Sequence, residues 1–115
     1  MNNMTEYEKN EVLKLRCIDR QLYCGLISNN KEIDSASYKR VPAKFTDPVK
    51  GQIYNKEDIT FPIATEVWGD ITEIALYDSV SGGNCTWKGN AEVVKTIGIA
   101  SQYKIPKNYL IVRLR

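Results

Sequence analysis

The spacing of apolar residues changes near residue 20 and divides the chain into two predicted parts. Before that point, apolar residues recur at helical spacing among charged ones. Thr5 and Glu8 have the separation of a capping box, in which each side chain satisfies a backbone donor at the start of a helix. We therefore predict a helix from about residue 6 to about residue 17, packed on a sheet or on a neighbouring subunit. Its apolar stripe consists of Val12, Leu15 and Ile18, with Leu13 nearby.

From residue 21 onward, apolar and polar residues alternate, which is typical of strands with one buried face. Pro42 interrupts one of these segments, and because proline has no N–H to donate to a sheet ladder, we expect that strand at an edge or at a bulge. Residues 29–37 and 46–51 are polar and are predicted to be loops. The predicted strands comprise residues 22–27, 38–45, 57–62, 71–78, 85–89, 91–97 and 109–115.

This pattern predicts a mainly β protein, a single antiparallel β-sandwich or small barrel of about seven short strands with an N-terminal α-helix. A chain of 115 residues is long enough for one hydrophobic core and too short for two. Its 43% hydrophobic and 26% charged residues are typical of a globular protein. We expect residues 1–20 to form an N-terminal helix and docking segment and residues 21–115 to form the β-sandwich domain.

The glycine-rich segment Ser81-Gly82-Gly83-Asn84 is the first candidate for chemistry, because glycine-rich loops can bind phosphate. A phosphate loop needs a following helix whose N-terminal amides point at the anion. Here the segment joins two predicted strands, and two adjacent glycines allow positive φ at little steric cost. We interpret it as a hairpin turn.

Charge and apolar runs suggest neither a nucleic-acid partner nor insertion into a membrane. The formal net charge is only +2, with basic and acidic residues intermixed. The longest apolar runs, such as residues 109–112, are far shorter than the roughly 20 residues that span a bilayer. The first residues are polar and carry no secretory signal, so we expect synthesis and assembly in the cytoplasm.

Histidine is absent from the chain, which argues against catalysis. Its absence excludes Ser-His and Cys-His nucleophile pairs and His-ligated zinc. Glu57 and Asp58 are adjacent in a predicted strand, so they point to opposite faces and cannot form a carboxylate pair. We predict a protein without catalytic residues, cofactor or metal ligands. The cysteines are expected to be small buried hydrophobic residues, and they are Cys17, Cys24 and Cys85.

Aromatic residues are the remaining candidates for binding. Trp68 and Trp87 can fill a core or, if exposed, stack on sugars. Four tyrosines lie on predicted loops or at the ends of predicted elements, where burial against another subunit competes with core packing. These possible interface residues are Tyr7, Tyr38, Tyr54 and Tyr103.

The segment from residue 58 to residue 78, followed by Ser81 to Asn84 and Trp87-Lys88-Gly89, resembles a family of small phage tail-fibre-like proteins. The resemblance extends to Leu22-Tyr23-Cys24-Gly25-Leu26, to Tyr38-Lys39-Arg40-Val41 and to the last strand. Ala75 departs from it, since the family often has glycine there. The motif is a signature of the fold, and its residues are Phe61, Trp68, Gly69, Ser81, Gly82, Gly83, Asn84, Trp87 and Gly89.

The resemblance implies a structural component of a tailed-phage virion that is assembled in the host bacterial cytoplasm. A tail fibre, a collar or tail adaptor, an attachment protein and a capsid decoration or head fibre are all compatible with it. Its expected partners are other virion structural proteins and copies of itself, with a trimer preferred. The alternative is a carbohydrate-binding β-sandwich that recognises a host surface glycan through tryptophan or tyrosine platforms.

Overall fold

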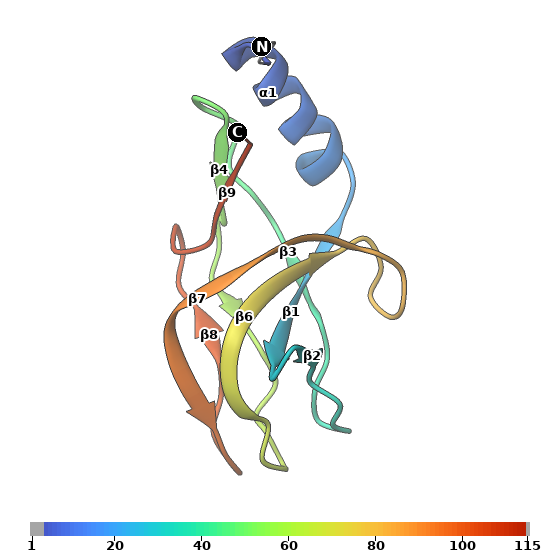
Figure 1. Ribbon diagram of the computed structural model, residues 1–115, viewed down its shortest axis with the longest axis vertical. Helices are drawn as coiled ribbons and strands as arrows, with labels where there is room; N and C mark the ends of the chain where they lie inside the picture. Colours follow the sequence, from blue (N-terminus) through green and yellow to red (C-terminus); the bar gives the residue numbers. More distant parts are fainter. Residues whose placement is uncertain (1–3, 115) are drawn as a thin grey trace.

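A single α-helix precedes an antiparallel β structure in the computed structural model, which describes residues 4–114 (Figure 1). The helix α1 (Glu6–Leu13) begins where predicted, and the Thr5 side chain accepts a hydrogen bond from the Glu8 N–H at 3.2 Å. A cap of this kind stabilises a helix by about 1 kcal/mol. The helix continues as a π-helical turn, η1 (Lys14–Ile18), instead of ending as a regular α-helix at residue 17.

The predicted apolar stripe of the helix is confirmed for Ile18, which packs against the core, and is wrong for Leu15, which is exposed. A π turn has hydrogen bonds between residues five apart, as between the Asp19 N–H and the Lys14 carbonyl, and it rotates later side chains around the axis. Leu13 is buried, whereas Leu15 is 63% exposed. Cys17 and Ile18 are half-buried against the core. The π-helical turn thus brings Ile18, five residues after Leu13, to the side of the helix that faces the β structure.

The main sheet has five strands, all antiparallel to their neighbours. Its order is β2-β1-β6-β7, and β3 pairs with the same edge of β1 as β2. Pro42 lies in β3, which pairs only with β1 among the described strands, so the predicted edge position is confirmed. The strands are β1 (Leu22–Ser28), β2 (Lys31–Glu32), β3 (Val41–Ala43), β6 (Gly69–Tyr77) and β7 (Cys85–Ile97).

β7 is one long strand where two separate strands were predicted. It pairs with β6, but the register shifts between Ile71, which faces Lys95, and Glu73, which faces Asn90. The four residues 91–94 therefore face a single residue of β6, which makes a bulge larger than the usual two residues against one. Figure 1 shows β7 bending strongly along its length. The sequence break near Gly89 and Asn90 marks the approach to this bulge and does not end the strand.

Two short ladders form a second layer over the main sheet. β4 (Gln52–Tyr54) pairs with β9 (Ile111–Arg113), and β5 (Ile59–Thr60) pairs with β8 (Lys104–Ile105). Side chains of both layers meet in one hydrophobic core. The fold is a small, open β-sandwich of nine strands within residues 4–114, and these strands do not close into a barrel. The prediction of a mainly β sandwich with an N-terminal helix is confirmed.

Asn55 connects the two ladders. It is fully buried, and its side-chain amide donates to the carbonyls of Glu57 at 2.8 Å and Pro106 at 2.9 Å. Its side-chain oxygen accepts from the Leu110 N–H at 2.8 Å. All polar groups of this buried side chain are therefore used to hold the segment around residues 106–110 beside the segment that follows β4.

The core is made of aliphatic and aromatic side chains from nearly every element. Leu22, Cys24 and Leu26 of β1 contribute to it with Ile74 and Leu76 of β6, as the alternating pattern predicted. Ile71 joins them although strict alternation would point it to the other face, because the register of β6 shifts between Ile71 and Glu73. Burial of Cys24 is also as predicted, but Cys17 is half-buried and Cys85 is exposed. Cys85 is the first residue of β7 and follows the exposed loop residues 80–84.

Candidate functional site

A polar network ties the outer edge of β1 to the loop between β6 and β7. Arg40 Nε and Nη2 each donate to a carboxylate oxygen of Glu32 at 2.7 Å, which makes a bidentate ion pair. Arg40 Nη1 donates to the carbonyls of Ser79 at 2.9 Å and Gly82 at 2.7 Å. The guanidinium carbon lies 3.5 Å from the ring centroid of Tyr77. Arg40 therefore fixes a loop that is about 40 residues later in the chain.

The hydroxyl group of Tyr38 fills a gap in the sheet. Along one edge of β1, residues 22–24 pair with β3 and residues 27–28 pair with β2. Between these pairs, the Leu26 N–H donates to the Tyr38 hydroxyl at 3.1 Å, and the hydroxyl donates to Glu32 at 2.6 Å. A Cβ atom on Gly25 would lie 2.7 Å from the Tyr77 ring and 2.8 Å from the Tyr38 hydroxyl oxygen. Only glycine leaves room for this arrangement.

The network determines the ionisation of its acidic member. Partial burial alone would raise the pKa of Glu32, but the hydrogen bonds from Arg40 and Tyr38 and the positive charge of Arg40 outweigh burial and lower that pKa. Burial, together with the hydrogen bond to Glu32, raises the pKa of Tyr38. Glu32 is therefore held as a carboxylate and Tyr38 as a neutral phenol. In these states Glu32 accepts hydrogen bonds from both Tyr38 and Arg40 and holds them together.

The predicted hairpin turn at residues 81–84 is confirmed, and its residues form a closed loop. Asp78 accepts hydrogen bonds from the backbone N–H of Asn84 at 2.7 Å and from its side-chain amide at 3.2 Å. The Asn84 N–H donor lowers the pKa of Asp78. Gly82 and Gly83 have φ values of 65° and 69°. Because the following residues form β7 and not a helix, the loop lacks the amide array of a phosphate site.

The aromatic residues of the fold signature are mainly structural. Phe61 is 1% and Trp68 is 6% exposed, and Tyr38 packs between them with ring centroids 6.3 Å and 5.6 Å away. Trp87 is half-buried, and its ring lies over Gly89, where an added Cβ would come within 2.8 Å of the indole. Gly69 begins β6 with a φ of 88°.

The four tyrosines predicted as interface residues lie in different environments. Tyr7 on α1 is 73% exposed, and Tyr54 in β4 is half-buried with its hydroxyl bonded to Gln52. Tyr38 belongs to the network above, and Tyr103 is 7% exposed in the core with its ring 6.1 Å from Phe61. The sequence did not reveal that Tyr38 and Tyr103 pack in the interior, because both pack with Phe61, which is far from each of them along the chain. The interface prediction is thus left with Tyr7 and Tyr54.

A surface groove lies between the bulged half of β7 and the segment that contains β8 and β9. It has a volume of about 640 Å³. Trp87 and Val93 line it from β7, and Tyr109 and Ile111 line it from the C-terminal segment. Val93, Tyr109 and Ile111 are 65%, 66% and 40% exposed. Apolar side chains therefore make up much of the groove, with polar residues such as Glu92 and Lys95 among them. The sequence signals for it were the β-branched segment 91–97 and the apolar residues at 109–112.

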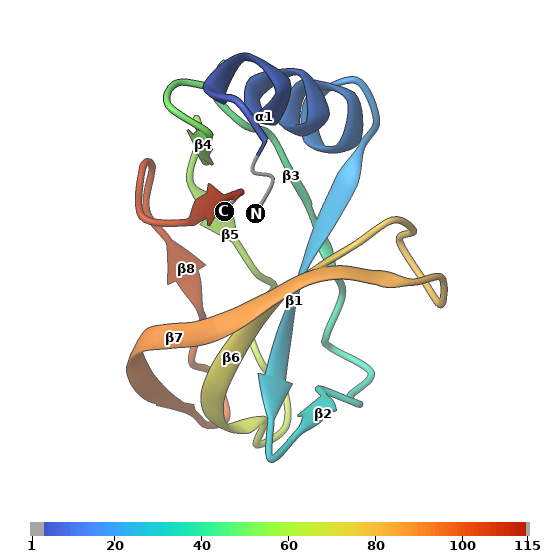
Figure 2. The same cartoon turned by 45° about the horizontal axis from the view of Figure 1, so that its top comes forward.

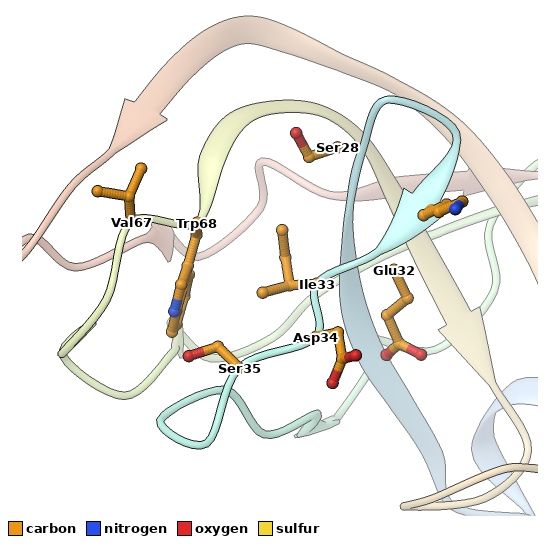
Figure 3. Close-up of a pocket in the computed structure, with 8 residues that line it drawn as sticks. Ser28, Glu32, Ile33, Asp34, Ser35, Val67 and Trp68 are labelled. Carbon is orange, nitrogen blue, oxygen red and sulfur yellow. The ribbon is translucent and has the colours of Figure 1, made fainter.

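A smaller pocket of about 180 Å³ lies beside β2 (Figure 3). Figure 3 shows the Trp68 ring on one side, Ile33 and Asp34 on the other, and Ser35 next to the end of the ring. The Trp68 indole N–H donates to Ser37 at 3.2 Å, so its polar atom is already used within the chain. The burial of Trp68 removes it as an exposed sugar platform.

Within residues 4–114, no group of three or more Cys, Asp or Glu side chains is close enough to hold a metal ion. No helix in that range is long and apolar enough to cross a membrane. Each buried side-chain nitrogen or oxygen of the described residues has a hydrogen-bond partner. The buried polar side chains of this part of the chain are therefore satisfied within the fold.

One protein family, described as Podophage GP4 fiber I protein gp80, matches residues 25–113. The matched range starts within β1 and ends in β9, so it contains nearly the whole β-sandwich and excludes α1. No curated protein matches the chain.

Proposed function

The chain belongs to the family described as Podophage GP4 fiber I protein gp80, a family of phage fibre proteins, and from this premise we propose that it works in the virion by binding neighbouring structural proteins. The observation that carries the proposal is the match over residues 25–113. The fold signature supports it, because these residues fill the core or close a loop and leave binding to the surface. In this proposal the protein has no catalytic role.

We place one binding surface on the N-terminal helix. α1 projects from one end of the β-sandwich, as Figure 2 shows, and it is fixed there by Leu13 and by the Asn10 side chain, which accepts from the Gly51 N–H at 2.9 Å. Tyr7 and Leu15 are 73% and 63% exposed on this helical segment. Exposed tyrosine and leucine on a fixed helix are suited to insertion into a groove of a larger protein.

Incorporation into particles tests this proposal. Phage are grown with the wild-type chain, with the double variant Tyr7→Ala/Leu15→Ser, or with Val67→Ser, which alters a 68% exposed residue of the β-sandwich as a control. Quantitative mass spectrometry of purified particles should find the wild type and the control, and at least about tenfold less of the double variant if the two side chains are central contacts. Absence of the wild-type chain from particles would contradict the proposed function. Equal incorporation of all three would contradict only the role of the helix.

The groove beside β7 favours a second function, the recognition of a host surface glycan. Trp87 and Tyr109 are aromatic and line the same groove, and Asn90, Glu92 and Lys95 add polar groups. Sugars bind to such a combination of aromatic faces and hydrogen-bonding groups. Titration with host surface polysaccharide should change the tryptophan fluorescence of the wild type but not that of Tyr109→Ala. A lack of any response, or an equal response of the variant, would contradict glycan binding in this groove.

A further inference from the structure

A pocket of about 310 Å³ lies where the helical segment joins the β-sandwich. The end of η1, the two residues before β1, the end of β3 with the two residues after it, and two residues after β4 line this pocket. Figure 2 shows the chain passing from the helix into β1, with β3 beside it. The apolar part of the lining consists of Cys17, Ile18, Ala43 and Phe45.

Positive charge dominates the polar part of the lining. Three cations, Arg20, Lys44 and Lys56, line the pocket together with one carboxylate, Glu57. The ion pairs within residues 4–114 involve other residues, so none of these three cations is paired with a carboxylate of that range. Like charges that share a pocket repel one another, and an anionic group that enters the pocket offsets this repulsion.

Hydrogen bonds within the chain hold these cations around the pocket. The Lys56 N–H donates to the Lys44 carbonyl at 3.0 Å, so the two lysines lie on adjacent segments. Arg20 Nε donates to a carbonyl of η1 at 2.7 Å, and its two Nη atoms make no hydrogen bond to the described residues. The Gln21 side-chain amide donates to the Ala43 carbonyl at 3.1 Å, and its oxygen accepts from Lys44 Nζ. The Nη atoms of Arg20 are thus available to an acceptor from another molecule.

We propose that this pocket binds an acidic segment of a neighbouring virion structural protein. Charge complementarity selects this partner, because carboxylates form strong charge-assisted hydrogen bonds with guanidinium and ammonium groups. The apolar lining favours a peptide, whose neighbouring side chains supply both a carboxylate and an apolar group. The pocket includes the end of η1, which also carries the exposed Leu15, so a partner that binds the helix is already beside it. The inference rests on the proposed assembly function and deepens it by naming the chemistry of one partner.

Carbodiimide treatment of intact particles tests the contact directly, because this reagent joins a lysine amine to a carboxylate that touches it. Mass spectrometry should identify Lys44 or Lys56 linked to an aspartate or glutamate of another virion protein. Lys39 and Lys88 are exposed lysines outside the pocket and should not be linked to that segment. The proposal fails if the pocket lysines form no such link, or are linked only within the chain or to a second copy.

Charge reversal tests whether the contact matters for assembly. Lys44→Glu/Lys56→Glu should lower incorporation into particles by on the order of tenfold, because carboxylates then face carboxylates. Lys44→Arg/Lys56→Arg keeps the charge, Lys39→Glu/Lys88→Glu changes net charge outside the pocket, and both should be incorporated like the wild type; circular dichroism checks that each variant is folded. Normal incorporation of Lys44→Glu/Lys56→Glu would overturn the role of the pocket, and would assign it to a glycan if that variant also loses binding of host polysaccharide. Absence of the wild type from particles would instead contradict the proposed function itself.

Discussion

Replacement of Asn55 by alanine should remove much of the stability of this domain. The change deletes three side-chain hydrogen bonds, to Glu57, Pro106 and Leu110, all between 2.8 and 2.9 Å. Asn55 is fully buried, so water does not replace the lost partners without entering the core. A hydrogen bond of this kind contributes about 0.5–1.5 kcal/mol net, which gives about 3 kcal/mol for the three.

That loss is large compared with the total stability of a domain of this size. At roughly 0.05–0.15 kcal/mol per residue, the free energy of unfolding is about 6–17 kcal/mol. Urea unfolding followed by tryptophan fluorescence measures the change, because Trp68 is buried in the folded state and exposed on unfolding. The midpoint should fall while the slope of the transition stays the same.

Asn90→Ala is the matched control for this measurement. Asn90 is an exposed asparagine of β7, and its replacement should change the free energy of unfolding by less than about 0.5 kcal/mol. If Asn55→Ala is destabilised by less than about 1 kcal/mol, the three hydrogen bonds do not hold the two ladders together, and the reasoning about Asn55 is refuted.

Two further predictions concern the network on the outer edge of β1. Gly25→Ala forces a methyl group to within 2.7 Å of the Tyr77 ring and should reduce the free energy of unfolding by about 1–3 kcal/mol, whereas Gly98→Ala, with open space around it, should have little effect in the same urea experiment. Glu32 has a lowered pKa in the folded state, so its contribution to stability is present above its unfolded value of 4.5 and is lost as the pH falls through the folded-state pKa. Thermal unfolding between pH 7 and pH 3 should therefore show a steeper acid loss for the wild type than for Glu32→Gln, and equal slopes would contradict the ion-pair argument.

The local parts of this fold could be predicted from the sequence, and the parts that depend on distant contacts could not. The Thr5 cap, the edge position of Pro42 and the turn around Gly82 and Gly83 follow from the chemistry of single residues, and the structure confirms all three. Alternation likewise revealed the buried faces of β1 and β6. Short-range patterns of this kind are independent of how the remainder of the chain packs.

The strand β2 was missed because its two residues, Lys31 and Glu32, are charged and show no apolar alternation, although they pair with the adjacent β1. The strands β4 and β8 were missed because each has only two or three residues and is held by a partner far along the chain. The same reason applies to Asn55, whose partners Pro106 and Leu110 are 51 and 55 residues away. Arg40 lies in the segment Tyr38-Lys39-Arg40-Val41, and nothing in the sequence around it indicates the loop that it fixes. Candidate interface tyrosines could not be separated from core tyrosines because their packing partners, such as Phe61 for Tyr103, are also far along the chain.

The two edges of the main sheet differ in whether a strand of another chain can add to them. At the β1 edge, the outer strands are the two-residue β2 and the three-residue β3. β3 contains Pro42, β2 consists of two charged residues, and the Tyr38 hydroxyl lies between the two strands. Such features prevent a further strand from adding there. The β7 side is continuous over 13 residues. Growth into a fibril by strand addition needs an open edge on both sides of the sheet, so the blocked β1 edge stops such growth after one addition.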